Sequence, residues 1–307
     1  MIYTASQYEH AVIGMMSKNN IILPNTGQDL FWIVQKSKNK VMFLPKTNID
    51  AGNKQQFIDF FSSVLNYGYP KLSLGYLNEE MLEVLRDVYK DITEKKLPNS
   101  KIMKLTAVQS IFENAQELFG AECLAGKQYI DLRETRNKFQ NKINDATITL
   151  DTNPSVDMYQ TSIKPLIEPF LKAWDESEGT KYGWQRHSGY DKSFFSAERY
   201  EKNVKELQTT FLIDTKTNVL IGYSVISLKP LTNSKTYPYV IRKCNNSYSR
   251  NTTRFLDYVS FKALYETIQT SFSIHWGASS GGVLKYKLSA FPVTKTEPSY
   301  FVTLPSL

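Results

Sequence analysis

The sequence has little of the chemistry on which metal sites and disulfide scaffolds depend. Its 307 residues include 2 cysteines, Cys123 and Cys244, and 3 histidines, His10, His187 and His275. Two cysteines are too few for a disulfide scaffold in a chain of this size, and no metal-ligand spacing is present. We therefore expect both cysteines to be reduced packing residues, and we expect no bound metal.

Long apolar runs are also missing. No stretch approaches the roughly 18 apolar residues that a membrane span needs. The first residues lack the basic and then apolar pattern of a secretion signal. We therefore expect a protein without a transmembrane segment, located in the cytoplasm.

Positive charge is in excess. The chain has 37 Lys and Arg residues against 30 Asp and Glu, a formal net charge of +7 and a pI near 9.1. Such a balance favours an anionic partner, such as nucleic acid, an acidic lipid headgroup or a phosphorylated cofactor. Many soluble proteins without a polyanionic partner are equally basic, so the charge alone does not decide.

The last hundred residues alternate between patterns typical of strands and of helices. Runs rich in Ile, Val, Leu and Phe predict strands, and apolar residues at helical spacing after Asn251-Thr252-Thr253 predict a helix. The predicted order is strands over 209–214, 219–228 and 237–243, a helix from about 252, a strand over 271–276, a helix around Leu284 and Leu288, and a strand over 299–304. A helix between strands implies a crossover connection and therefore a mixed sheet.

The first half also mixes the two patterns. We predict a hairpin of strands over 31–35 and 40–44, a helix over 54–65, a strand near 72–74 and a helix over 78–89. Asp151-Thr152-Asn153-Pro154 breaks the pattern, so we place a domain boundary near residue 150. The chain is then an α/β (α+β) protein with domains of residues 1–150 and 151–307, the first a possible degenerate copy of the second.

The predicted order of the C-terminal elements resembles the core of the N-acetyltransferase-like (GNAT) superfamily. The stretch 124–144 is similar to a signature of bacterial tandem-GNAT proteins related to the C-terminal domain of phosphatidylglycerol lysyltransferase. The matching residues are Gly126, Lys127, Tyr129, Arg136, Asn137 and Lys142. Lys287 and Phe291 fit an ending that this family shares with the Fem-type aminoacyltransferases.

The resemblance implies two GNAT-like domains with mixed, largely antiparallel sheets flanked by helices, the C-terminal one holding the active site. Relatives move amino acids from aminoacyl-tRNA onto lipid or peptide amines and hydroxyls, and related viral enzymes attach amino acids to modified bases of DNA. The donor would be aminoacyl-tRNA or acyl-CoA, and tRNA or DNA is the expected partner, with an anionic lipid headgroup as another. Residues 244–252, where CoA-dependent members have a glycine-rich pyrophosphate loop, contain no glycine. This favours a donor other than acetyl-CoA, although Arg250 and Arg254 could pair with phosphates.

Acyl transfer needs a nucleophilic acceptor and a stabilised oxyanion, and four residues are candidates for these roles. Lys287 could stabilise an oxyanion or phosphate, or be a solvated lysine on a helix face. Asp257 could orient an amine or act as a base, or pair with Arg254. Tyr258 could donate a proton or simply pack, and His275 could act at a strand end or be structural.

Besides Arg250 and Arg254, substrate-binding candidates come from three stretches. Arg133, Arg136, Lys138 and Lys142 form a basic run that, with Tyr129 and Phe139, could bind a phosphate backbone and stack on bases, or be a solvated helix face. Residues 184–190 include Trp184 and His187 in a predicted loop, either part of a substrate pocket or a structural loop. Trp276 follows His275 at the end of a predicted strand, where ligands often bind.

Three functions are compatible with these patterns. The first is a transferase that moves an aminoacyl or acyl group onto a macromolecular acceptor, with a nucleic acid as donor carrier or acceptor. The second is a GNAT-like protein that has lost catalysis and binds a polyanion. The third is a CoA-dependent N-acetyltransferase.

Overall fold

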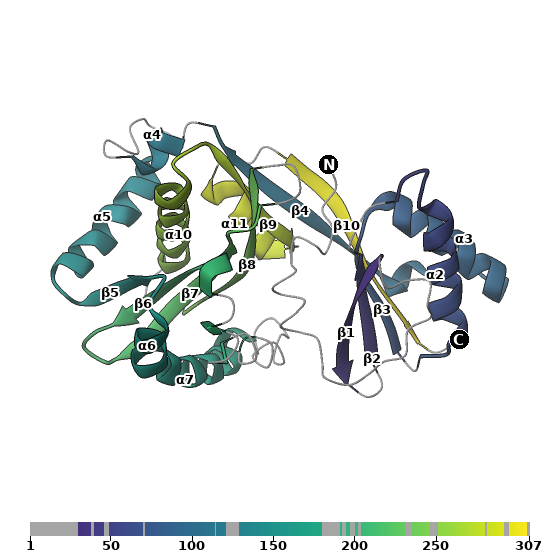
Figure 1. The fold of residues 1–307 in the computed structure, drawn as a ribbon, viewed down its shortest axis with the longest axis horizontal. Helices are drawn as coiled ribbons and strands as arrows, with labels where there is room; N and C mark the ends of the chain where they lie inside the picture. The colour runs from purple at the N-terminus through teal and green to yellow at the C-terminus, as the bar shows by residue number, and fades with distance from the viewer. Residues whose placement is uncertain are drawn as a thin grey trace. The chain divides into compact units, whose positions relative to one another are not determined.

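The structure, a computed structural model, describes most of the chain (Figure 1). It describes residues 30–37, 40–45, 49–69, 71–113, 115–120, 129–179, 191, 195–196, 200–201, 204–230, 235–245, 248, 251–279, 281–291 and 295–305. Backbone contacts divide the chain into two compact units. The first consists of the described residues of Met1–Val108, Gly277–Leu288 and Lys295–Leu307, and the second of those of Gln109–Trp276 and Ser289–Thr294. Neither unit is one continuous stretch of sequence.

The first unit is a mixed sheet with two helices packed on it (Figure 1). Its elements are β1 (Phe31–Ser37), β2 (Lys40–Pro45), α2 (Lys54–Asn66), β3 (Lys71–Leu77), α3 (Glu79–Thr93), a 3₁₀ turn (Asn99–Lys101), the start of β4 (Ile102–Phe112), most of α11 (Gly281–Ala290) and β10 (Lys295–Pro305). The strand order is β1-β2-β3-β10-β4. β1 and β2 are antiparallel, as are β3 and β10, whereas β2 and β3 are parallel and joined by the crossover helix α2.

Apolar side chains of α2 and α3 close the core of the first unit. Phe31 of β1 stacks on Phe60 of α2 with 4.0 Å between ring centroids, and both rings are buried. The helix α3 begins where the sequence predicts, because the Asn78 side chain accepts the backbone N–H of Met81 at 2.7 Å.

The second unit is a mixed sheet between helices. Its elements are the end of β4, α4 (Ala115–Phe119), α5 (Ile130–Asn144), β5 (Ile148–Thr152), α6 (Val156–Met158), a π-helical turn (Tyr159–Ile163), α7 (Lys164–Trp174), a second π-helical turn (Asp175–Gly179), a 3₁₀ turn (Val204–Glu206), β6 (Leu207–Asp214), β7 (Val219–Ser227), β8 (Thr236–Cys244), α10 (Thr252–Ile268) and β9 (Phe272–Ser279), whose last residues belong to the first unit. The strand order is β4-β9-β8-β7-β6-β5. The strands β5 to β8 form an antiparallel ladder, and β8 pairs with β9 in parallel.

Helices cover both faces of this sheet. On one face α10 lies over β7, where its Ser260 meets Ser224, and α5 packs on α10 through Phe139 stacked on Phe255 at 4.5 Å. On the other face α7 packs against β7, with the Phe170 ring 5.5 Å from that of Tyr223 in an edge-on arrangement. Neighbouring β-strand residues point to opposite faces, except at a register shift, where β8 has one extra residue, Val240, opposite Val225 and Ile226 of β7. Tyr239 and Arg242 therefore share the face that α10 covers.

The expected fold class is confirmed: both units are mixed sheets flanked by helices, and the C-terminal order of strands and helices is the one predicted. One local expectation differs. The stretch around Asp151, taken as a break in the pattern, is the strand β5, which pairs with β6. The division at residue 150 therefore falls inside the second unit, and as a statement about domains it stays a prediction.

Candidate functional site

The parallel pair β8 and β9 separates shortly after it begins. Thr236 to Pro238 pair with Ser273 to His275, and no further pair of these strands forms among their described residues. From Tyr239 to Cys244, the described pairs of β8 are with β7. Ladder hydrogen bonds alternate along an antiparallel strand. Because the N–H of Asn245 bonds to β7, the backbone of Cys244 and Arg242 points to the other side, toward the separation. The carboxyl end of a parallel strand is where open sheets commonly bind ligands.

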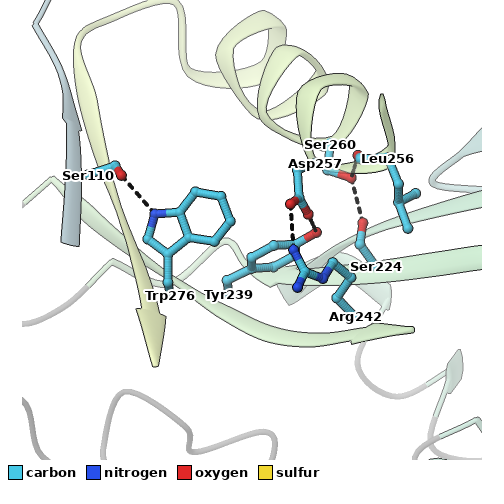
Figure 2. A network of polar contacts seen from close by, with 8 residues as sticks. All are labelled: Ser110, Ser224, Tyr239, Arg242, Leu256, Asp257, Ser260 and Trp276. Carbon is cyan, nitrogen blue, oxygen red and sulfur yellow. Dashed lines mark hydrogen bonds and ion pairs between the residues drawn. The ribbon is translucent and has the colours of Figure 1, made fainter. Parts of the chain in front are cut away.

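A buried carboxylate lies beside this separation (Figure 2). Asp257, on α10, is 0% exposed. The hydroxyl of Tyr239 donates to its Oδ1 at 2.5 Å, and Nη1 of Arg242 lies 2.5 Å from its Oδ2. Both donors come from β8, so one carboxylate holds two side chains of the separating strand.

The members of this triad differ in protonation and in exposure to solvent. Burial, together with the neighbouring Asp257 charge, raises the pKa of Tyr239 well above 10, so the phenol stays protonated and donates. Asp257 is buried, whereas the Arg242 side chain retains 18% of its exposure. Of the two charged side chains of the triad, only that of Arg242 is therefore partly exposed.

Further polar and aromatic contacts hold the triad in place (Figure 2). Ser224, opposite Arg242 in the β7–β8 register, lies 2.5 Å from the hydroxyl of Ser260, which also donates to the Leu256 carbonyl at 2.6 Å. Ser260 is one helical turn after Asp257, so this contact fixes α10 over the strands at the level of the carboxylate.

The ring of Trp276 packs edge-on against Tyr239, with 5.8 Å between centroids. Its indole N–H donates to the hydroxyl of Ser110 at 2.8 Å (Figure 2). The indole, itself held by Ser110, therefore packs against the Tyr239 ring and restricts its position.

A second buried ion pair lies on the opposite face of β8. Lys243 follows Arg242 in the chain, and its ammonium group pairs with Asp191 and lies 4.4 Å from the centroid of the Trp174 ring. The Tyr223 hydroxyl donates to the same carboxylate at 2.5 Å. The side chains of Lys243 and Asp191 are 7% and 3% exposed. Successive residues of β8 are thus tied to carboxylates on both faces of the sheet.

The four catalytic candidates do not meet at one point. Asp257 pairs with Arg242, and the expected alternative partner, Arg254, instead lies 3.6 Å from Asp131. Because Asp257 is fully buried, its position favours orienting other side chains over acting as a base. His275 is 2% exposed within β9.

The other two candidates are also buried. Tyr258 is 3% exposed, with its ring 5.8 Å from that of Phe119. Lys287 lies in the first unit, 7% exposed, and its ammonium donates to the carbonyl of Gly277 at 3.3 Å. The interpretation of Lys287 as a solvated lysine is wrong, because the helix turns it inward, and its role with an oxyanion stays a prediction.

Trp276, a predicted substrate-binding residue, is 4% exposed. Its ring also lies 5.1 Å from Phe261 and 5.8 Å from Phe291, as part of an aromatic cluster. This burial favours a packing role.

The basic run lies on α5 but does not form one face. Residues of an α-helix rotate by about 100° each, so Arg133 and Lys142 point to opposite sides. Lys142 lies 4.6 Å over the Tyr248 ring, and Lys138 is exposed. The expected base-stacking residue Phe139 is buried against α10, so it is not placed to stack on bases.

Arg136, also a predicted substrate-binding residue of that run, donates a hydrogen bond to the side chain of its neighbour Asn137 at 3.0 Å. Trp184, His187 and Arg250 lie outside the described residues.

The residues that sequence reasoning missed are Arg242 and Tyr239. One signal for Arg242 was present, because a charged residue stood inside the run Tyr-Pro-Tyr-Val-Ile-Arg-Lys that otherwise reads as a buried strand. Nothing in the sequence indicated that Asp257 would be the partner.

Within the described ranges, no cluster of three or more His, Cys, Asp or Glu residues is arranged to hold a metal ion. None of the described helices has the length and apolar character needed to cross a bilayer.

Comparisons with known proteins give the fold its context. No protein-family model matches the sequence, and no curated protein matches it. Solved structures do match. The C-terminal domain of a putative lysylphosphatidylglycerol synthetase from Agrobacterium fabrum aligns with a TM-score of 0.55 at 10% identity, over 98% of this chain and 88% of that one. L-PGS from Bacillus licheniformis aligns with a TM-score of 0.52 at 12% identity, over 97% and 86%.

A third match is a tandem GNAT protein from the clavulanic acid biosynthesis pathway, with a TM-score of 0.50 at 9% identity, over 90% and 79%. The chain has a GNAT-like fold. The expected resemblance to tandem GNAT proteins is confirmed at the level of the fold, which is all that identities this low can show.

Proposed function

We propose that this protein is an acyltransferase that moves an aminoacyl group from an activated ester onto a hydroxyl or amine acceptor. The observation that carries the proposal is the separation of β8 from β9 beside the triad of Asp257, Tyr239 and Arg242. The strand edge left by β9 presents backbone groups to an extended ligand, and the triad places a fixed positive charge next to it.

The chemistry asks for little besides positioning. An aminoacyl ester is already activated, so attack by an acceptor oxygen or nitrogen expels the carrier hydroxyl once the two are held in line. A cation near the donor carbonyl stabilises the negative charge that develops on its oxygen. Arg242 supplies such a charge in the second unit, and Lys287 remains the predicted cation of the first.

Two of the similar structures favour an aminoacyl group as the group transferred, because their names denote a synthetase of lysylphosphatidylglycerol. They also favour a lipid acceptor. The expectation of a nucleic acid as acceptor, or of DNA modification, gains no support from these comparisons and stays a prediction.

The test is a transfer assay with radiolabelled donors. Purified protein is incubated with total aminoacyl-tRNA or with acetyl-CoA, and each donor is offered vesicles of phosphatidylglycerol, vesicles of phosphatidylcholine, or duplex DNA. Label moving from aminoacyl-tRNA to a lipid supports the proposal. Transfer from acetyl-CoA alone identifies an acetyltransferase, and no transfer from any donor overturns the proposal in favour of a binding protein.

A further inference from the structure

We propose that Arg242 is the anion-recognition residue of the second unit, and that it binds an oxyanion, a phosphate or carboxylate group, of the substrate. The assignment of that anion to a transferase substrate rests on the proposed function. The binding itself follows from the geometry of β8 and α10 and can be measured without turnover.

The triad is costly to bury. Moving a carboxylate out of water costs several kcal/mol, and well-packed apolar residues often serve stability as well as a buried ion pair does. Stability is therefore a weak reason for a fully buried Asp257. The carboxylate has a geometric effect instead. Its Oδ2 holds Nη1 of Arg242, and the Tyr239 hydroxyl holds the carboxylate itself through Oδ1.

The group that Asp257 holds has a shape suited to anions. A guanidinium is planar and carries five N–H donors in a rigid fork, which matches the two oxygens of a phosphate or carboxylate. Fixing Nη1 against Asp257 fixes the whole plane. An arginine oriented in advance loses less conformational entropy when an anion binds, and 18% of this side chain is still exposed.

The other cations of β8 and α10 are held differently. Lys243 is almost fully buried between Asp191 and Trp174. Arg254 and Lys262 make surface ion pairs, the first at 3.6 Å with an 83% exposed partner and the second at 3.4 Å with Glu266 in the next turn. Surface pairs of this kind hold their side chains weakly. On these two elements, Arg242 alone combines a buried carboxylate partner with exposure.

Arg242 also lies close to the separation of β8 from β9. It belongs to the part of β8 that no longer pairs with β9, and its side chain lies on the face of the sheet that α10 covers. An anion bound there would lie at the carboxyl end of the strand, next to the edge that the proposed donor would occupy.

The experiment measures anion affinity on the full chain. Inorganic phosphate and acetate are titrated by calorimetry at constant ionic strength, and phosphatidylglycerol vesicles are compared with phosphatidylcholine vesicles by flotation. The variants are Arg242→Gln, Arg242→Lys and the matched control Lys262→Gln, which removes the same charge from the surface of α10. Because Arg242→Gln leaves Asp257 buried without its cation, the double variant R242Q/D257N is included as the form expected to fold.

We expect R242Q/D257N to lose about ten- to a hundredfold in affinity for phosphate, the range of a charged hydrogen bond. Lys262→Gln should change it less than about twofold. Arg242→Lys should lose affinity too, because an ammonium lacks the fork. If the wild-type protein binds phosphatidylglycerol vesicles but not free phosphate, the anion belongs to a lipid headgroup. Binding of both would identify a phosphate group as such.

Unchanged phosphate, acetate and vesicle affinities in R242Q/D257N would overturn the inference, as would wild-type protein that binds none of these anions. Failure of the proposed function has a different signature: wild-type protein that binds an anion through Arg242 but transfers no aminoacyl group. Transfer activity whose KM is indifferent to Arg242 would sink this inference and leave the proposed function standing.

Discussion

Replacing Lys243 by Met should destabilise the protein by about 3–5 kcal/mol, the cost of leaving one member of a buried pair without the other. The side chains of Lys243 and Asp191 are 7% and 3% exposed, so water cannot replace the lost cation. Methionine keeps an apolar stem against Trp174, and the change therefore removes charge with little loss of packing. The Tyr223 hydroxyl still donates to Asp191 but does not neutralise it.

The decisive comparison is the double variant K243M/D191N. Asparagine keeps an acceptor for Tyr223 and removes the uncompensated charge, so the double variant should recover at least about 2 kcal/mol relative to K243M alone. Lys229→Met is the control, since Lys229 and Glu206 form a pair that is 56% and 40% exposed and should be worth less than about 1 kcal/mol.

The assay is urea unfolding followed by circular dichroism, with midpoints compared at an unchanged m-value. Strictly additive losses in K243M, D191N and the double variant would refute the reasoning, because they would mean that the two charges do not compensate each other.

Three other changes have defined outcomes. Tyr239→Phe removes the hydroxyl that donates to Oδ1 of the buried Asp257 and should cost about 1–3 kcal/mol in urea unfolding; a loss within error would mean that this hydrogen bond does not stabilise the fold. Gly222→Ala places a Cβ 2.8 Å from the sulfur of Cys244 and 2.9 Å from the Lys243 carbonyl oxygen, so the melting temperature should fall, and Cys244→Ala in the same chain should restore only part of it. Burial raises the pKa of the Cys244 thiol to about 12, so the folded state holds this proton above the unfolded pKa of about 8.5. The free energy of unfolding should then fall as pH rises from about 8.5 to 10, by up to about 1.4 kcal/mol per pH unit, and Cys244→Ala should flatten that slope; equal slopes would show that the thiol does not carry the effect.

Much of the fold could be predicted because local patterns and tertiary structure agree. The strands β6, β7 and β8 are runs of apolar and β-branched residues buried on both faces, and α3 begins at its Asn78 cap. Where the two levels diverged, the prediction failed. The strand β5 is short and half polar, and only its pairing with β6 makes it a strand.

The candidate site was less predictable because its contacts are distant in sequence. Asp257 was singled out, but its nearest cation along the helix, Arg254, is not its partner. The choice of Arg242 depends on how α10 lies across β8, which no local spacing encodes. The burial of Phe139 and Trp276 is similarly decided by the elements that pack over them.

The position of β10 has a consequence for how the protein is made. This strand comes from the end of the chain, yet it lies between β3 and β4 in the sheet of the first unit. During synthesis, β3 has therefore left the ribosome long before its neighbour exists, and the edge of β3 waits while the whole second unit is translated. An unpaired edge strand is a template for wrong partners. The first unit therefore starts to be made before the second, but its sheet can be completed only after the second unit has been translated.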